Sequence, residues 1–376
     1  MMTIHSAKYL WSGTELGEAR ALAPHYYTSE EIFKQEVEHI HLKNWFFAAR
    51  TDELASSGDY RSIDTVGGPV LLTRDEQGEL HAFANFCRHR GSILLEGCGN
   101  RRNILCPYHA WSYKLDGSMM RAPGMADVPG FDPEHNALVP IRMSVWRGNI
   151  FLNFDDNAPD LMTHLGDFDE LVGTNKLEDM VCVWRKDIIA ECNWKLLLEN
   201  AMETYHTGIV HAKTVGAQNS LTFAAKGEWH AIQVQSLMTS AVLDKTQDAP
   251  FPQIEGLSEQ AKQGTFFTLV EPTTQFCCAQ DCMWWLVVRP IAVDRTHLSV
   301  GGCFPKHLLE LPDFEERAQP YYHRWGTVAL EDVGILEKQQ KGLSSVRYTP
   351  GHLSWRDDVV HDMNNWLLRH LPIAKG

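Results

Sequence analysis

The sequence predicts an α+β protein with two domains, an all-β domain followed by an α+β domain. Its 376 residues are more than one hydrophobic core usually holds, so two domains are expected. Residues 40–155 carry short β-like segments separated by turn signals, whereas residues 156–376 combine such segments with long helical patterns. Residues 1–39 form a short helical segment ahead of both domains.

A helix is expected late in this N-terminal segment. Thr28 and Glu31 have the spacing of a capping box. Apolar residues then recur at roughly helical spacing, at Phe33, Val37, Ile40 and Trp45.

The first domain is expected to consist of antiparallel strand pairs around glycine turns. Turn signals stand at residues 75–78, at Asp116-Gly117 and at Gly148. The strands expected beside them cover residues 69–73, 79–85, 110–115, 144–146 and 149–154.

The second domain is expected to begin after Asp156 with a short helix and a strand over residues 181–189. A helix over residues 194–206 follows, with no Gly or Pro inside it. Residues 265–304 are rich in β-branched and aromatic side chains, which is typical of a sheet, and residues 313–341 continue as a long helix.

Charge and hydropathy exclude several classes of function. The formal charge is -14 and no basic run occurs, so nucleic acid is not an expected partner. No apolar run approaches the roughly 20 residues that span a bilayer, and residues 1–17 do not resemble a signal peptide. We therefore expect a cytoplasmic protein without membrane contact, whose nine cysteines are ligands or core residues rather than disulfides.

Two cysteine–histidine pairs lie close together in the first domain. Cys87 and His89 form a C-x-H pair, and residues 90–105 join it to a second pair. Cys106 and His109 form this second pair, C-x2-H. Two thiolates and two imidazoles suit either zinc or an iron–sulfur centre, so ligand count alone leaves both possible.

The sequences CRHRG and CPYHAW around these pairs resemble the Rieske cluster motif. The resemblance implies a [2Fe–2S] cluster with Cys87 and Cys106 on one iron and with His89 and His109 on the other. Imidazole ligands raise the potential of such a cluster to about -150 to +300 mV. Cys98, between the pairs, is expected to be a loop or core residue.

A second set of possible metal ligands follows the helix expected over residues 194–206. Glu199, Glu203 and His206 are spaced i, i+4 and i+7 and would share one helical face. Gly208 offers a break that lets His211 turn back toward His206. Two histidines and one carboxylate on one side of an iron leave open positions for oxygen.

This segment is similar to the E-x2-H-x4-H signature of the Rieske oxygenase catalytic domain. The resemblance implies a mononuclear Fe(II) bound by His206 and His211, with a carboxylate ligand from a late helix. Here Asp332 is the expected carboxylate, with Glu331 and Glu337 as alternatives.

Glu203 is expected to be catalytic, because many family members carry an aspartate there that links the cluster histidine of a neighbouring subunit to the iron-bound histidine. A longer carboxylate can make the same hydrogen bonds. The resemblance thus implies a homotrimer in which each cluster serves the next subunit's iron. Glutamate at this position also resembles the carnitine, choline and betaine branch, whereas a solvated helix-face glutamate is the simpler alternative.

The resemblance runs from about residue 40 to Leu343 and implies a Rieske domain followed by a helix-grip-like catalytic domain. It implies an oxygenase that adds one or both atoms of O2 to a small organic substrate, aromatic or N-alkyl. No G-x-G-x-x-G motif occurs, so a separate NAD(P)H-dependent reductase, with or without a ferredoxin, is the expected electron source. A Rieske electron carrier without oxygenase activity and a zinc-stabilised binding module are the alternatives.

Aromatic residues in the strand-rich block suit a substrate pocket, although core packing explains them equally well. Such side chains stack on a flat ring or attract a quaternary ammonium group. The residues concerned are Phe266, Phe267, Phe276, Met283, Trp284 and Trp285. The nearby run from Cys277 to Cys282 is interpreted as strand rather than as a metal site.

Overall fold

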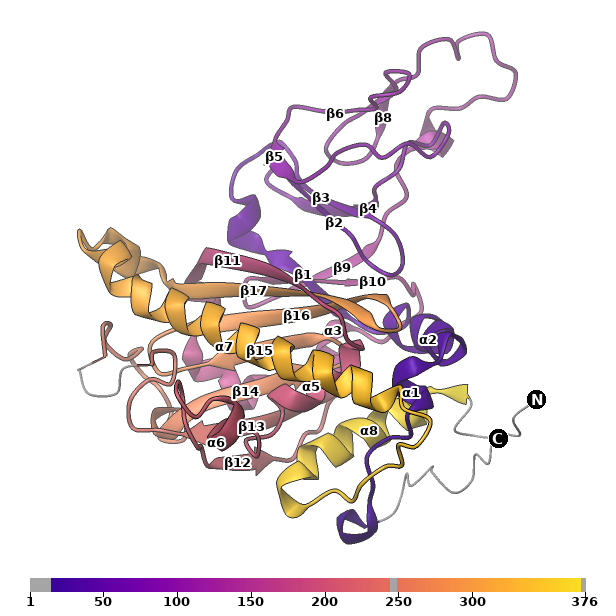
Figure 1. Cartoon of the computed structure of the whole chain (residues 1–376). Helices are drawn as coiled ribbons and strands as arrows, with labels where there is room; N and C mark the ends of the chain where they lie inside the picture. Colours follow the sequence, from indigo (N-terminus) through magenta and orange to yellow (C-terminus); the bar gives the residue numbers. More distant parts are fainter. Residues whose placement is uncertain (1–14, 244–248, 373–376) are drawn as a thin grey trace. The chain divides into compact units, whose positions relative to one another are not determined.

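The computed structural model describes residues 15–243 and 249–372 (Figure 1). It divides into two compact units, one from Leu42 to Ala158 and one that joins the residues up to His41 with those from Pro159 onward. Most of the segment 1–17, where no signal peptide is expected, lies outside the described residues.

The unit from Leu42 to Ala158 consists of three small antiparallel sheets. One contains β2 (Asp59–Ile63), β3 (Val70–Arg74), β4 (Leu80–Ala84) and β5 (Cys98–Asn100). The second contains β6 (Ile104–Leu105), β7 (Ser112–Tyr113) and β8 (Met119–Arg121). The third contains β1 (Phe46–Arg50), β9 (Arg142–Trp146) and β10 (Asn149–Asn153).

The three expected glycine turns join strands of these sheets. Gly78, Gly117 and Gly148 have φ angles of +85°, +82° and +74°, a region that side chains rarely adopt. At Gly117 a Cβ atom would also lie 2.5 Å from the ring of Phe83. Both the positive φ angle and the lack of space therefore exclude a side chain at this position. The expected strand pairs around these turns are confirmed.

The other unit is built on an antiparallel sheet, seven-stranded in the described residues, with the order β11-β17-β16-β15-β14-β13-β12. The strands are β11 (Met180–Ala190), β12 (Ser220–Phe223), β13 (Trp229–Gln235), β14 (Gly264–Val270), β15 (Thr274–Cys278), β16 (Met283–Ala292) and β17 (Arg295–Pro305). The helices are α1 (His25–Thr28), α2 (Glu30–Glu36), α3 (Leu161–Leu165), α4 (Phe168–Val172), α5 (Trp194–Ala201), α6 (Thr207–Val210), α7 (Phe314–Leu343) and α8 (Asp358–His370). The order of an all-β domain and then an α+β domain is confirmed.

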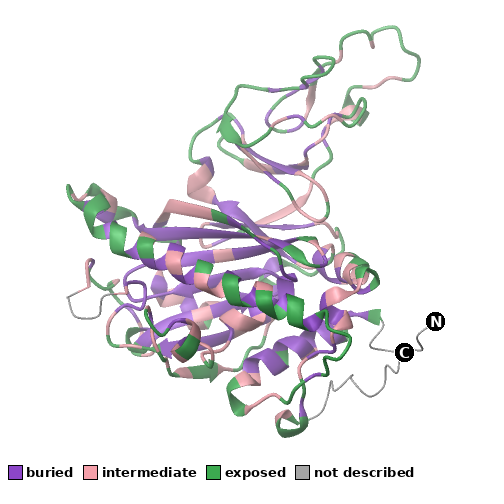
Figure 2. Ribbon diagram, in the orientation of Figure 1, coloured by how far each residue is buried: buried purple, intermediate pink, exposed green. Residues whose placement is uncertain are grey.

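Helix α7 runs across one face of this sheet (Figure 1). A Cβ atom at Gly302 of β17 would lie 1.9 Å from the ring of Trp325, so only glycine lets the helix approach this closely. Trp325 is 1% exposed. Figure 2 shows that the strands beneath α7 are largely buried while the outer side of α7 is exposed. This contact fixes the position of the helix residues that follow Trp325.

Two local expectations are wrong. The cap of α2 is Ser29, whose hydroxyl accepts a hydrogen bond from the Ile32 N–H at 3.4 Å, because Ser29 has the extended backbone of an N-cap residue. Thr28 ends α1 instead, and its hydroxyl donates to the Pro24 carbonyl at 3.0 Å. The run from Cys277 to Cys282 is strand only to Cys278, after which it turns into β16.

None of the helices within residues 15–243 and 249–372 has the length and apolar character that a membrane crossing requires.

Candidate metal centres

The two cysteine–histidine pairs lie in two loops of the same design. In the first loop the Gly91 N–H donates to the Cys87 carbonyl at 2.9 Å, and in the second the Ala110 N–H donates to the Cys106 carbonyl at 3.1 Å. Gly91 and Ala110 have φ angles of +74° and +58°, and this left-handed backbone conformation reverses the direction of each loop. The two loops are therefore closed by the same kind of backbone turn.

These loops combine buried sulfur with exposed imidazole. Cys87 and Cys106 are each 2% exposed, whereas His89 and His109 are exposed and their ring centroids lie 4.8 Å apart. Trp111 stacks on His89, with the rings 4.8 Å apart and 12° from parallel. Two thiols and two imidazoles are the donors that a Rieske cluster takes. Because the histidines are exposed, they would give an electron donor a short path to the cluster.

The helix before His206 is shorter than expected. Helix α5 ends at Ala201, so the predicted common helical face of Glu199, Glu203 and His206 is wrong. The Glu203 carboxylate accepts hydrogen bonds from two backbone N–H groups after it, including that of His206 at 3.2 Å, and these bonds favour a turn over a continued helix. Gly208 lies inside α6, so the break expected there is also wrong.

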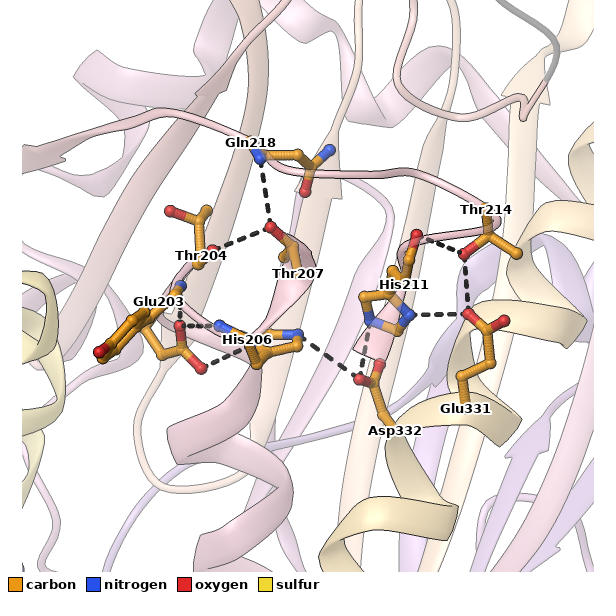
Figure 3. A network of polar contacts seen from close by, with 10 residues as sticks. Glu203, Thr204, His206, Thr207, His211, Thr214, Gln218, Glu331 and Asp332 are labelled. Atoms are coloured by element: carbon orange, nitrogen blue, oxygen red, sulfur yellow. Dashed lines mark hydrogen bonds and ion pairs between the residues drawn. The ribbon is translucent and has the colours of Figure 1, made fainter. Parts of the chain in front are cut away.

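His206, His211 and Asp332 nevertheless converge (Figure 3). The Oδ1 atom of Asp332 lies 3.6 Å from Nε2 of His206 and 2.9 Å from Nε2 of His211. One possible ligand atom of each residue lies within 4.8 Å of the others. Of the alternatives, Glu337 accepts a hydrogen bond from the backbone of Glu191 at 3.1 Å and takes no part in this cluster.

The three side chains fit a divalent metal ion. Glu203 Oε1 lies 2.5 Å from Nδ1 of His206, and Glu331 Oε2 lies 2.7 Å from Nδ1 of His211. A ring that donates its Nδ1–H to a carboxylate keeps a lone pair on Nε2. Asp332 Oδ1 is buried, and among the described residues no donor is aligned to hydrogen-bond it. Two imidazole lone pairs and one carboxylate oxygen therefore face a common point, the donor set of non-haem Fe(II).

Glu331 has a position different from that of a metal ligand. Its Oε2 atom accepts hydrogen bonds from His211 and from the Thr214 hydroxyl, at 2.7 and 2.8 Å (Figure 3). The pKa of His211 is raised overall. Burial alone would lower it, but the carboxylates of Asp332 and Glu331 have the larger combined effect. Neighbouring helix residues point about 100° apart, so Glu331 reaches the far side of the ring that Asp332 faces.

Replacing Glu331 by alanine is expected to weaken iron binding about 10- to 100-fold without abolishing it, because the orienting bond to His211 is lost. Glu331→Gln, which keeps an acceptor oxygen, should weaken it less. Competition with a ferrous chelator measures the affinity, and Glu337→Ala on the same helix is the matched control with native affinity. Complete loss of iron in Glu331→Ala, with retention in Asp332→Ala, would make Glu331 the ligand.

A pocket lies beside His206, His211 and Asp332. The sheet contributes mostly apolar side chains, from Ile232, Val234, Phe267, Cys277, Trp284, Leu286 and Val300. Helix α7 contributes Arg324, Trp325, Val328 and Ala329. An apolar pocket with a few polar groups is the usual form of a small-molecule site.

Only some of the expected aromatic residues line this pocket. Phe267 and Trp284 do, with ring centroids 5.5 Å apart, whereas Phe266 and Trp285 are fully buried on the other face of the sheet. Phe276 and Met283, also expected, are buried outside the pocket lining. Successive side chains of a strand point to opposite faces, so neighbours in β14 and β16 cannot both face the pocket.

Comparison with protein families assigns both units. The model of the Rieske [2Fe-2S] domain matches residues 44–132. The model of the ring hydroxylating alpha subunit, catalytic domain, matches residues 177–373, more than half of the chain. The chain belongs to the ring-hydroxylating alpha-subunit family. The expected family and its two cofactor-binding domains, one for a [2Fe–2S] cluster and one for mononuclear iron, are thereby confirmed.

Several relatives of this family member are known. The carnitine monooxygenase oxygenase subunit of Acinetobacter baumannii is 36% identical over 189 residues, which are 50% of this chain and 51% of the relative. The chain thus matches about half the length of this relative. The glycine betaine monooxygenase oxygenase subunit of Chromohalobacter salexigens is 25% identical over 88% of this chain and 80% of its own. A solved apo structure of a quaternary ammonium Rieske monooxygenase is similar with a TM-score of 0.77 and 26% identity, covering 94% of this chain and 96% of that one.

Proposed function

We propose that this chain is the oxygenase component of a Rieske monooxygenase that hydroxylates a C–H bond beside nitrogen in a small N-alkyl compound. The observation that carries the proposal is the cluster of His206, His211 and Asp332 on the wall of an apolar pocket, in a chain that also has a Rieske domain. A pure electron carrier needs neither the second centre nor the pocket. The relatives named as carnitine and glycine betaine monooxygenases support the N-alkyl substrate class.

Each group has a defined task in this proposal. Cys87, His89, Cys106 and His109 hold the cluster, which receives electrons from a separate NAD(P)H-dependent reductase. The mononuclear iron, when bound, supplies the activation of O2. Glu203 and Glu331 keep a proton on Nδ1 of the two iron-binding imidazoles, and the apolar pocket wall excludes water from the substrate.

An oxygen-uptake screen tests this function. The purified chain, a surrogate reductase and NADH are supplied with trimethylammonium compounds or with simple aromatic compounds. Substrate-dependent uptake with the trimethylammonium compounds is expected. Uptake with aromatic compounds alone would favour ring hydroxylation, and a reducible cluster without any uptake would favour the electron carrier.

We also propose that the chain works as a homotrimer in which Glu203 bridges His206 of its own chain and His109 of a neighbour. Glu203 already contacts His206, and the His109 ring is exposed. Tyr205 and Ile209, which follow Glu203 in the sequence, are 59% and 84% exposed, and exposed apolar side chains of this size often mark an interface. A closed ring repeats one such contact at every interface.

Co-expression of His109→Ala with His206→Ala is expected to restore part of the activity that each variant lacks alone. In randomly mixed trimers, about one interface in four pairs an intact cluster with an intact iron, so activity should reach ~25% of native. Turnover of trimers identified by native mass spectrometry measures this. His109→Ala mixed with Cys106→Ala is the control, since both lack the cluster. Mixed trimers without activity would refute the bridge.

A further inference from the structure

Arg324 is a buried cation on the wall of the pocket. Its side chain is 5% exposed and comes from α7, two helical turns before Asp332. The Nε–H donates to the Ser240 carbonyl at 3.1 Å, and the guanidinium lies 4.7 Å from the ring centroid of Trp284. Arg324 is therefore held in place from two sides.

No anion neutralises this cation directly. Among residues 15–243 and 249–372, none forms an ion pair with Arg324, and the hydrogen bond that its guanidinium makes there comes from Nε, not from the two terminal nitrogens. Burial lowers the pKa of Arg324, and the interactions with Cys277 and with the Asp332 carboxylate offset this effect only in part. Burying a guanidinium without an ion-pair partner costs free energy. A ligand with acceptor oxygens would lower this cost by pairing with Arg324.

A second donor without a partner lines the same pocket. Gln275 is 3% exposed, and its Nε2 atom is buried without a hydrogen-bond partner in the described part of the chain. Gln275 pairs with Leu286 and Cys277 pairs with Trp284, so these four side chains share the sheet face that forms the pocket wall. Gln275 and Arg324 thus line the same pocket, where the Gln275 amide and the terminal nitrogens of Arg324 can donate hydrogen bonds to a ligand.

Trp284 narrows the possible ligands further. One face of its ring is occupied by the Arg324 guanidinium. A quaternary ammonium group bound on this indole would lie beside a like charge, which is unfavourable. Trp284 is therefore disfavoured as the side chain that binds a quaternary ammonium group.

We propose that Arg324 and Gln275 bind a carboxylate group of the substrate in the pocket beside the iron site. This inference rests on the proposed function and adds the requirement for an anionic group. Arg324 and Asp332 are eight residues apart on α7, about 12 Å along the helix axis, so a spacer separates the carboxylate from the carbon that reacts. A fork of guanidinium N–H groups matches the two oxygens of a carboxylate.

Equilibrium binding of matched probes tests the carboxylate without any mutation. The probes are 4-(trimethylammonio)butanoate and its methyl ester, and 4-phenylbutanoate and 4-phenylbutan-1-ol, so that each pair differs in the carboxylate. Quenching of tryptophan fluorescence in the full chain measures affinity, with equilibrium dialysis as a check. At least one acid is expected to bind about 10-fold or more tightly than its neutral partner. Equal affinities within both pairs would overturn the proposal.

Variants then test the two residues. Arg324→Gln should bring the ratio of acid to neutral affinity to about 1, Arg324→Lys should keep part of it, and Gln275→Leu should lower it several-fold. Arg317→Gln removes an exposed charge of the same helix, ion-paired to Asp313, and should leave the ratio unchanged. A native ratio in Arg324→Gln would overturn the assignment of Arg324.

The outcomes separate this inference from the proposed function. Visible absorption of the cluster and the iron content show whether a variant is folded. If Arg324→Gln does not fold, the native probe pairs and Arg324→Lys decide, because a purely structural arginine predicts no preference for the acids. A preference for the acids without any oxygen uptake would refute the oxygenase and leave the carboxylate site standing.

Discussion

Replacing Asp332 by alanine is expected to remove the mononuclear iron and to reduce oxygen-dependent turnover to background. Asp332 supplies a carboxylate oxygen that faces Nε2 of both His206 and His211, and two neutral imidazoles alone hold Fe(II) weakly. Elemental analysis should find only the cluster iron. The visible spectrum should stay native, because the proposed cluster ligands belong to the other compact unit.

Two further variants make this result specific. Asp332→Asn keeps the shape of the side chain and loses its charge, so partial iron loss is expected if charge holds the metal. Glu337→Ala removes an acidic residue of the same helix whose carboxylate bonds to the Glu191 backbone, and iron should stay native. Full iron in Asp332→Ala would show that the third ligand comes from another residue.

The two loops that carry Cys87, His89, Cys106 and His109 are short, and their local structure depends mostly on the nearby sequence. The proposed ligands lie between Cys87 and His109, and each pair is held within a loop closed by local backbone hydrogen bonds. Spacing along the chain therefore specifies most of the geometry. Zinc could be set aside only through the match of residues 44–132 to the Rieske domain, since both metals take these ligands.

The sequence predicted that His206, His211 and Asp332 converge, but it did not predict the path of the chain that brings them together. The absence of Gly and Pro suggested one helix to His206, yet Glu203 binds backbone N–H groups and the helix ends at Ala201. The position of Asp332 depends on how α7 packs on the sheet at Gly302, a contact between distant parts of the chain that no local pattern encodes. Family resemblance, not spacing, supplied this residue.

The sequence alone did not predict which side chains line the pocket. Phe266 and Phe267 are equally apolar, and only the register of β14 decides that Phe267 faces the pocket. Arg324 was missed because arginine on a long, mostly polar helix reads as a solvated side chain. Its burial depends on tertiary packing against Trp284. The strands β12 and β13 and the helix α8 were likewise not anticipated.

Replacing Cys106 by alanine is expected to abolish the visible absorption of the cluster and all turnover, while the mononuclear iron stays bound. The thiol of Cys106 is 2% exposed and sits in the loop that also presents His109, so no other cysteine of this loop can replace it. Without a cluster, electrons have no route to the iron. Spectra and elemental analysis of the purified variant measure both losses, which are the reverse of those expected for Asp332→Ala.

Cys98 supplies the matched control for this variant. It lies between the two pairs in sequence, but it is exposed at the start of β5, outside both loops. Cys98→Ser should therefore keep the native spectrum and turnover. A coloured Cys106→Ala protein beside a colourless Cys98→Ser protein would move the cluster to a different cysteine. Colour loss in both would instead point to a loss of folding in this small unit, which a melting curve followed by circular dichroism would detect.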